Sequence, residues 1–206
     1  MGDKTKRIIM SILGMGLLGV CIAMLRIAEF GTDPFTCLVV GVANIIGSTY
    51  GTVYLLLVGL LIVIVFFINK RYIGIGTIIN IMLVGSVGDF SFNIINSLYG
   101  FDSLVSRVIL FVAAIILLCF ASALYITADL GVSSYDAVSL IMADKKVAQY
   151  RICRIITDVF CTVVGAIFGA VVGIGTVITA FGMGPLTQWF MDNVTNKMLS
   201  TGRKAA

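Results

Sequence analysis

The chain has 206 residues, of which 60% are hydrophobic and 12% charged, with a mean hydropathy of +1.12 and a formal net charge of +4. This number of polar side chains is too small to cover the surface of a globular protein in water. The composition therefore excludes a soluble domain and indicates an integral membrane protein. We attribute the positive charge to membrane topology and to contact with anionic lipid headgroups, and expect no nucleic-acid partner.

Six apolar segments are predicted to span the membrane as helices. A bilayer core about 30 Å thick requires about 20 apolar residues in a helix, and the segments that fit run over 8–25, 52–68, 75–95, 104–127, 152–172 and 174–194. The first follows Lys4, Lys6 and Arg7 and shows no small-residue cleavage site, so we interpret it as a retained helix rather than a signal peptide. The fold class predicted is therefore an all-α membrane protein.

Two shorter helices are expected between these spans. Asp33 can cap a helix over 34–46 whose first residue is Pro34. Ser133 and Asp136 stand at capping-box spacing before a second helix, over 134–144. At 1.5 Å per residue, about 13 residues reach only about 20 Å, so both helices are predicted to be re-entrant or interfacial.

The chain contains an internal repeat. Gly74-Ile75-Gly76-Thr77 returns 99 positions later as Gly173-Ile174-Gly175-Thr176. Upstream, Ala23, Ala28, Glu29 and Gly31 correspond to Ala123, Ala128, Asp129 and Gly131. We predict two repeats, 1–100 and 101–206, each with three spans and one short helix. Because three is odd, the repeats must enter the membrane in opposite orientations.

The basic residues favour a topology with both termini in the cytoplasm. This arrangement puts 12 of the 14 basic residues on the cytoplasmic side, and only Arg26 and Arg107 fall outside. It also puts the first short helix on the external side and the second on the cytoplasmic side.

Several chemistries lack residues to carry them. The chain has no histidine, and its five cysteines are scattered singly, so we expect neither a metal site nor a nucleophilic dyad, and no enzyme. Gly14 to Gly19 matches G-x-G-x-x-G, but it lies inside a predicted span with no preceding strand, so helix packing explains it better than a cofactor. We predict no cofactor.

The repeated glycine motif has two interpretations. Gly74, Gly76, Gly173 and Gly175 are typical of a tight backbone turn or of close packing where a long helix begins. Alternatively, the backbone N–H groups with Thr77 and Thr176 face a substrate or ion, as in the discontinuous helices of transporters.

Acids at membrane depth form a second group of candidates, since an ionised carboxylate there needs a partner or water. Asp89 lies in the third span, where the other half has Gln188. Hydration near the membrane surface is the alternative to ion or substrate binding at Asp89. Asp158 stands four residues after Arg154, a spacing that predicts an ion pair within one helix.

The remaining candidates lie at helix ends or carry neutral polar groups. Glu29 and Asp129 close the first helix of each half, and with Asp33 they are either solvated charges or residues of a gate or vestibule. Asp136 is either a helix cap or a substrate contact. Asn80 either joins two helices by hydrogen bonding or contacts a ligand.

These features resemble a known family. An acid and a glycine are followed by a G-x-x-P-x-D-like turn, and Gly-Ile-Gly-Thr then opens a helix that ends near Gly and Asp; both halves repeat this order. The pattern resembles that of YczE/YitT-type bacterial integral membrane proteins over nearly the whole chain. The first turn has Pro34 but Thr36 in place of Asp, and the second has Asp136 but Ser134 in place of Pro. The resemblance implies a transporter in a bacterial inner or plasma membrane.

The function predicted is secondary transport of a small polar solute or ion by alternating access between the repeats. The predicted substrate contacts are Asp89, Asn80, Thr77, Thr176, Gln188 and Asp136. The alternative is a substrate-binding or accessory subunit that acts with a separate energising partner. Homodimerisation through a seam at Gly165 and Gly169 is a further prediction, although such seams serve internal packing equally well.

Overall fold

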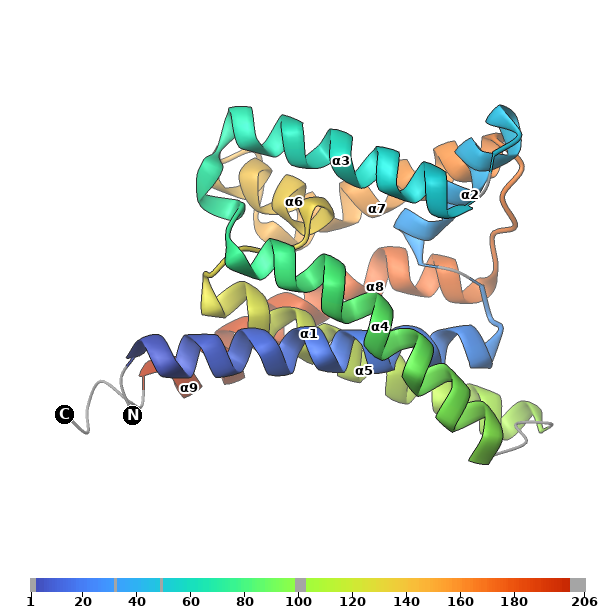
Figure 1. Ribbon diagram of the computed structural model, residues 1–206, viewed down its shortest axis with the longest axis horizontal. Helices are drawn as coiled ribbons and strands as arrows, with labels where there is room; N and C mark the ends of the chain where they lie inside the picture. The colour runs from blue at the N-terminus through green and yellow to red at the C-terminus, as the bar shows by residue number, and fades with distance from the viewer. Residues whose placement is uncertain (1–2, 32, 49, 99–102, 201–206) are drawn as a thin grey trace. The chain divides into compact units, whose positions relative to one another are not determined.

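The computed structural model describes residues 3–31, 33–48, 50–98 and 103–200, and every regular element in these ranges is a helix (Figure 1). The all-helical prediction is therefore confirmed for this part of the chain. In chain order the elements are α1 (Asp3–Ala28), α2 (Pro34–Ile46), α3 (Tyr50–Ile68), a 3-10 turn (Lys70–Tyr72), α4 (Ile75–Leu98), α5 (Leu104–Ala128), α6 (Ser134–Asp144), α7 (Tyr150–Ile167), α8 (Ile174–Phe190), a π-helical turn (Met191–Thr195) and α9 (Asn196–Ser200).

Three helices in the described ranges are long and apolar enough to cross a bilayer: Lys4–Ala28 in α1, Ile75–Ser97 in α4 and Leu104–Ala128 in α5. The apolar segment Thr52–Ile68 in α3 is shorter. The predicted end of the fifth span, at Val172, was wrong, because α7 ends at Ile167. Gly169 adopts a left-handed φ of +82°, and the Ala170 N–H donates to the Gly165 carbonyl at 2.9 Å, which closes the helix.

Both short helices have the predicted bounds. α2 begins as its sequence indicates, since the Asp33 carboxylate accepts the Thr36 N–H at 3.1 Å and Pro34 occupies the first helical position. It ends at Gly47, which is left-handed with φ +67°. α6 covers Ser134–Asp144.

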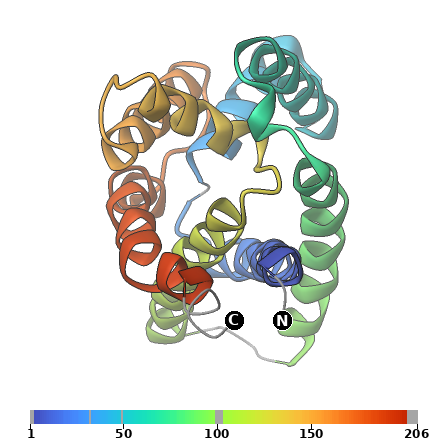
Figure 2. The same ribbon diagram turned by 90° about the vertical axis from the view of Figure 1, so that its left-hand side faces the viewer.

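The helices gather into two compact units. The first unit comprises Met1–Glu29, Arg71–Ser133 and Leu186–Ala206, and the second comprises Phe30–Lys70 and Ser134–Pro185. Each unit draws on both sequence halves, so the units and the predicted repeats divide the chain differently. Within the first unit, α1 packs against both α4 and α5, and Figure 2 shows it between them.

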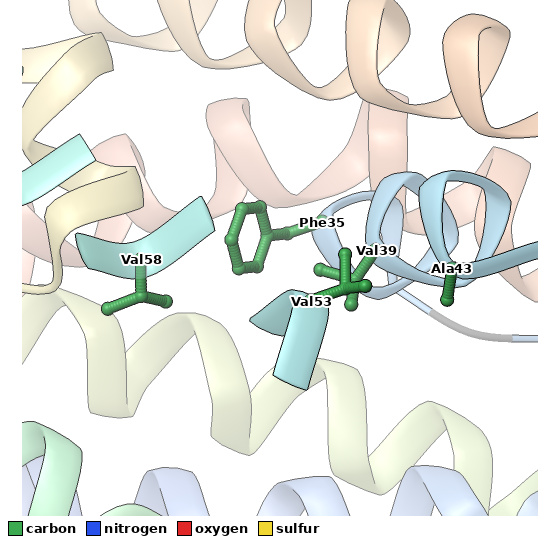
Figure 3. Close-up of a cluster of buried hydrophobic side chains, with 5 residues drawn as sticks. All are labelled: Phe35, Val39, Ala43, Val53 and Val58. Carbon is green, nitrogen blue, oxygen red and sulfur yellow. The ribbon is translucent and has the colours of Figure 1, made fainter. Parts of the chain in front are cut away.

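In the second unit, α2 packs against α3 and α7, and α6 packs against the same two helices. A hydrophobic cluster joins α2 to α3, in which the ring of Phe35 extends toward Val58 and Val39 lies near Val53 (Figure 3). α2 meets α7 at Gly41 and Gly165, where a Cβ on Gly41 would lie 2.6 Å from the Gly165 carbonyl oxygen. Gly165 therefore packs against α2 inside this unit.

Candidate functional site

Each glycine motif contacts the turn that ends the first helix of the other half. In the first unit the Gly76 N–H donates to the Leu130 carbonyl at 2.9 Å. In the second unit the Gly175 N–H donates to the Phe30 carbonyl at 2.8 Å. The donors Gly76 and Gly175 are equivalent in the repeat, and so are the acceptors Leu130 and Phe30. Each half therefore donates the same backbone hydrogen bond to the other half.

Glycine is required on both sides of this contact. Gly131 has φ +109°, and a Cβ there would lie 2.7 Å from the Gly74 nitrogen. Gly31 has φ +121°, and its Cβ would lie 2.7 Å from the Thr176 hydroxyl oxygen. A left-handed backbone and direct contact between main chains both favour a residue without a side chain. The predicted backbone-turn residues Gly74, Gly76, Gly173 and Gly175 therefore lie where two turns meet.

The Thr77 hydroxyl takes part in the same contact. It lies 2.9 Å from the Val132 carbonyl oxygen and 3.3 Å from that of Tyr72, and it accepts the Gly74 N–H at 3.3 Å. Thr77 and its counterpart Thr176 are both buried. In this conformation the Thr77 hydroxyl bonds the protein's own backbone.

Two equivalent arginines make a second exchanged contact, within the first unit. Arg7, near the start of α1, donates to the Ala128 carbonyl at the end of α5, at 2.9 Å. Arg107, near the start of α5, donates through Nε to the Ala28 carbonyl at the end of α1, at 3.0 Å. Since each helix start contacts the other helix end, α1 and α5 run antiparallel. Midway, a Cβ on Gly14 would lie 2.8 Å from the Ala121 carbonyl oxygen.

The predicted vestibule acids Glu29 and Asp129 end these two helices in the left-handed conformation, with φ +55° and +54°. Glu29 accepts a hydrogen bond from Arg107 at 2.8 Å, and Asp129 accepts one from Arg71 at 2.9 Å. Both carboxylates are well exposed. Exposed ion pairs of this kind contribute little stability. The hydrogen bonds from Arg7 and Arg107 to backbone carbonyls therefore contribute more to holding the ends of α1 and α5.

The second unit contains a buried charged cluster, which we define as Tyr135 and Asp136 of α6 with Arg154 and Asp158 of α7. Arg154 donates through Nη1 to Asp136 and through Nε to Asp158, the latter at 3.2 Å. The Tyr135 hydroxyl donates to the other oxygen of Asp158 at 2.5 Å. The guanidinium also lies over the Tyr135 ring, 4.7 Å from its centroid. One arginine thus bridges two carboxylates.

Neighbouring side chains hold the buried charged cluster in place. The Phe35 ring stacks on Tyr135 with centroids 4.9 Å apart, which connects the cluster to α2. The hydroxyls of Ser139 and Thr157 lie 2.9 Å apart and join α6 to α7 beside it. Arg154, Asp136 and Asp158 are all buried, so the cluster is a set of desolvated charges rather than a surface network.

Sequence spacing found part of this cluster. The predicted ion pair between Arg154 and Asp158 is confirmed. Asp136 lies in the first turn of α6, as its capping position indicates, yet its carboxylate also pairs with Arg154. Neither Tyr135 nor Arg154 was a predicted site residue. The sequence contained a signal for Arg154, its spacing to Asp158, and none for Tyr135, because the contact between α6 and α7 joins two different helices.

The other predicted substrate contacts lie apart from this cluster in the chain. Asn80 of α4 is buried, and its Nδ2 has no hydrogen-bond partner in the described part of the chain. Gln188 donates to Asp192 at 2.9 Å on an exposed stretch. Asp89 belongs to α4, but its side chain lies outside the described residues.

Asp33, which we predicted to be a vestibule residue, is partly exposed at the start of α2, and its carboxylate bonds both the backbone N–H and the hydroxyl of Thr36. Among the described residues, no three His, Cys, Asp or Glu side chains are grouped so as to hold a metal ion. The buried charged cluster offers carboxylate, guanidinium and phenol groups as hydrogen-bonding partners.

Sequence similarity assigns the chain to a protein family. A family model described as a family of unknown function, DUF6198, matches residues 5–192. The chain belongs to this family. YyaS, an uncharacterised protein of Bacillus subtilis, is 28% identical over 193 residues, covering 93% of this chain and 96% of its own length. An uncharacterised protein of Haemophilus influenzae is 25% identical over 187 residues, covering 91% and 84%. No solved structure matches the chain significantly.

Proposed function

We propose that this DUF6198 protein is a bacterial inner- or plasma-membrane protein that carries a small polar solute by alternating access between two inverted repeats. The proposal retains six spans, repeats over 1–100 and 101–206, and the relation to YczE/YitT-type proteins. The exchanged contacts of Arg7 and Arg107 support it, since equivalent first helices that run antiparallel are what inverted repeats require.

The surface and the charges support a membrane setting. Large apolar side chains such as Phe67, Ile75 and Val171 are at least three-quarters exposed, which suits contact with lipid rather than water. The two basic residues that fall outside the proposed cytoplasmic side have local roles. Arg107 bonds the end of α1, and Arg26 lies over the Phe92 ring at 4.5 Å.

The observation that carries solute binding is the buried charged cluster. Three desolvated charges cost more to bury than a well-packed apolar core of similar volume, and the cluster is therefore hard to explain as a device for stability alone. Within membrane spans, ionisable groups typically mark the path of a substrate or ion. In the first unit, the Nδ2 atom of Asn80, which has no hydrogen-bond partner in the described part of the chain, is a separate group able to donate a hydrogen bond.

Ligand-induced stabilisation tests this proposal. Purified full-length protein in mild detergent is melted with amino acids, sugars, nucleosides, organic acids and chloride salts, each added alone, because a ligand of the folded state raises the midpoint by mass action. Asp136→Asn is the matched variant, since it keeps the shape of the side chain and removes one charge of the buried charged cluster. We expect a compound that stabilises the wild type but not Asp136→Asn, and that the wild type takes up in proteoliposomes.

Two outcomes would count against transport. A compound that stabilises the protein without being taken up would favour a substrate-binding or accessory subunit. If nothing in the panel stabilises the protein and nothing is taken up, the transport proposal fails in this form. Recovery of a partner complex with the chain in mild detergent would then favour the accessory-subunit function.

A further inference from the structure

The buried charged cluster adjoins an apolar surface, and Tyr135 belongs to both. Its hydroxyl donates to Asp158 at 2.5 Å, and the Arg154 guanidinium lies over its ring. The same ring stacks on Phe35 and packs against the hydrophobic cluster that joins α2 to α3, which includes Val58. The second unit therefore places charged groups and apolar side chains against one aromatic ring.

The internal repeat shows that the charges of this region come from one half of the chain. Because α2 and α6 begin at residues 34 and 134, and α3 and α7 at residues 50 and 150, equivalent residues differ by 100 in number. At the four positions of the buried charged cluster the first half has uncharged side chains: Phe35, Thr36, Tyr54 and Val58. The edge contact of Phe35 with Tyr54 corresponds to the contact of Tyr135 with Arg154. One half thus contributes charged groups, and the other contributes aromatic and aliphatic groups.

Arg154 forms one ion pair within its own helix and one with another helix. Its Nε donates to Asp158, four residues further along α7, at 3.2 Å, whereas its Nη1 donates to Asp136 of α6. The pair within α7 is held by helical spacing, so it orients the guanidinium independently of α6. Separation of Arg154 from Asp136 is costly in a buried position unless groups of the appropriate charge replace both partners.

We propose that the solute is an α-amino acid with an apolar side chain, whose two charged groups insert between Arg154 and Asp136. The carboxylate of the amino acid pairs with the Arg154 guanidinium, and its ammonium pairs with the Asp136 carboxylate. Each of the two residues exchanges one partner for another of the same sign, and no covalent bond changes. The apolar side chain lies toward Phe35 and Tyr135. This step rests on the solute binding proposed above and names the class of solute.

A zwitterion fits this ion pair better than a solute with a single charge. An amine would pair with Asp136 but offer Arg154 no anion in exchange, and an acid without an ammonium would do the reverse. A site whose buried polar groups lose a partner discriminates against such an analogue by about 10⁴-fold or more. The apolar surface beside Tyr135 favours an aliphatic or aromatic side chain over a polar one.

A matched set of leucine analogues tests the assignment. Purified full-length protein in mild detergent is melted with leucine, with isopentylamine, which lacks the carboxylate, and with 4-methylpentanoate, which lacks the ammonium. At 100 times its Kd, leucine should raise the melting midpoint by about 5–10 °C. Neither analogue should raise the midpoint at the same concentration. Glycine, which has no apolar side chain, should require at least about tenfold more for the same shift.

Asp136→Asn should change which of these compounds binds. The ammonium of leucine loses its anionic partner, so leucine should no longer stabilise this variant. The Arg154 guanidinium still attracts a carboxylate, so 4-methylpentanoate should stabilise Asp136→Asn although it does not stabilise the wild type. Asp144→Asn, an exposed acid on the same helix, should keep the wild-type response to leucine. If Asp136 had a structural role alone, its substitution would change the midpoint without this exchange of ligands.

Any of four results would overturn the amino-acid site: no stabilisation of the wild type by leucine, equal stabilisation by leucine and either analogue, equal potency of leucine and glycine, or a response to leucine that Asp136→Asn retains. Stabilisation by a sugar or nucleoside in place of leucine would overturn it and still support solute binding. Stabilisation by leucine without uptake in proteoliposomes would uphold the amino-acid site and count against transport. Failure of the amino-acid site and failure of transport are therefore distinguished.

Discussion

Removal of Arg154 should destabilise the protein far more than removal of either acid that it bridges. Arg154→Gln removes the guanidinium that pairs with both Asp136 and Asp158, and these two carboxylates are buried. Breaking a buried pair in this way costs about 3–5 kcal/mol. Asp136→Asn instead leaves a balanced pair of Arg154 and Asp158, so we expect a loss of no more than about 1 kcal/mol.

The five cysteines provide the assay. All are free and buried, so a thiol-reactive dye becomes fluorescent only as the chain unfolds. At about 2–4 °C per kcal/mol for a chain of this size, Arg154→Gln should lower the melting midpoint by about 6–20 °C. Arg151→Gln, an exposed position on the same helix, is the control and should change it by less than about 2 °C. Equal midpoints for Arg154→Gln and the wild type, or an equal loss in the control, would refute the reasoning.

Three further substitutions, two of them paired with a comparison variant, probe the contacts between and within the halves by the same dye assay. Gly131→Ala should lower the free energy of unfolding by more than about 3 kcal/mol, because it adds a clash with Gly74 to a strained backbone. Gly47 is also left-handed but has open space around it, so Gly47→Ala should lower the free energy of unfolding by only about 1 kcal/mol. Equal losses would contradict the close contact at Gly131. Arg107→Ala should cost about 1–2 kcal/mol through the lost carbonyl bond, and a similar loss from Glu29→Gln would show that the exposed ion pair dominates instead. Tyr135→Phe should cost about 1.5–3 kcal/mol, since its hydroxyl bonds a charged group, and an unchanged midpoint would argue against that bond.

Local signals predicted the elements of this fold well. Asp33 followed by Pro34 predicted the start of α2, and the structure has both the cap and the first residue there. The fifth span was predicted five residues too long at its end, because hydropathy continues through Gly169 while the backbone turns there. A hydrophobic run reports burial in lipid or protein, but the conformation of one glycine decides where a helix stops.

Partners across the chain were harder to predict than elements. The repeat identified Gly76 and Gly175 as equivalent, but only the structure shows that each bonds the turn of the opposite half. Likewise, helical spacing found the pair of Arg154 and Asp158, since both residues lie on one helix. Asp136 joins them from another helix, and no periodicity within a single segment encodes such a contact.

The orientation of the two short helices tests the inverted-repeat account most directly. Ser48→Cys, just after α2, and Val147→Cys, just after α6, place exposed thiols at matching positions in the two halves, against a background of buried native cysteines. The account predicts that a membrane-impermeant maleimide labels Ser48→Cys in intact cells, but labels Val147→Cys only after permeabilisation. Labelling of both positions from the same side of the membrane would contradict it.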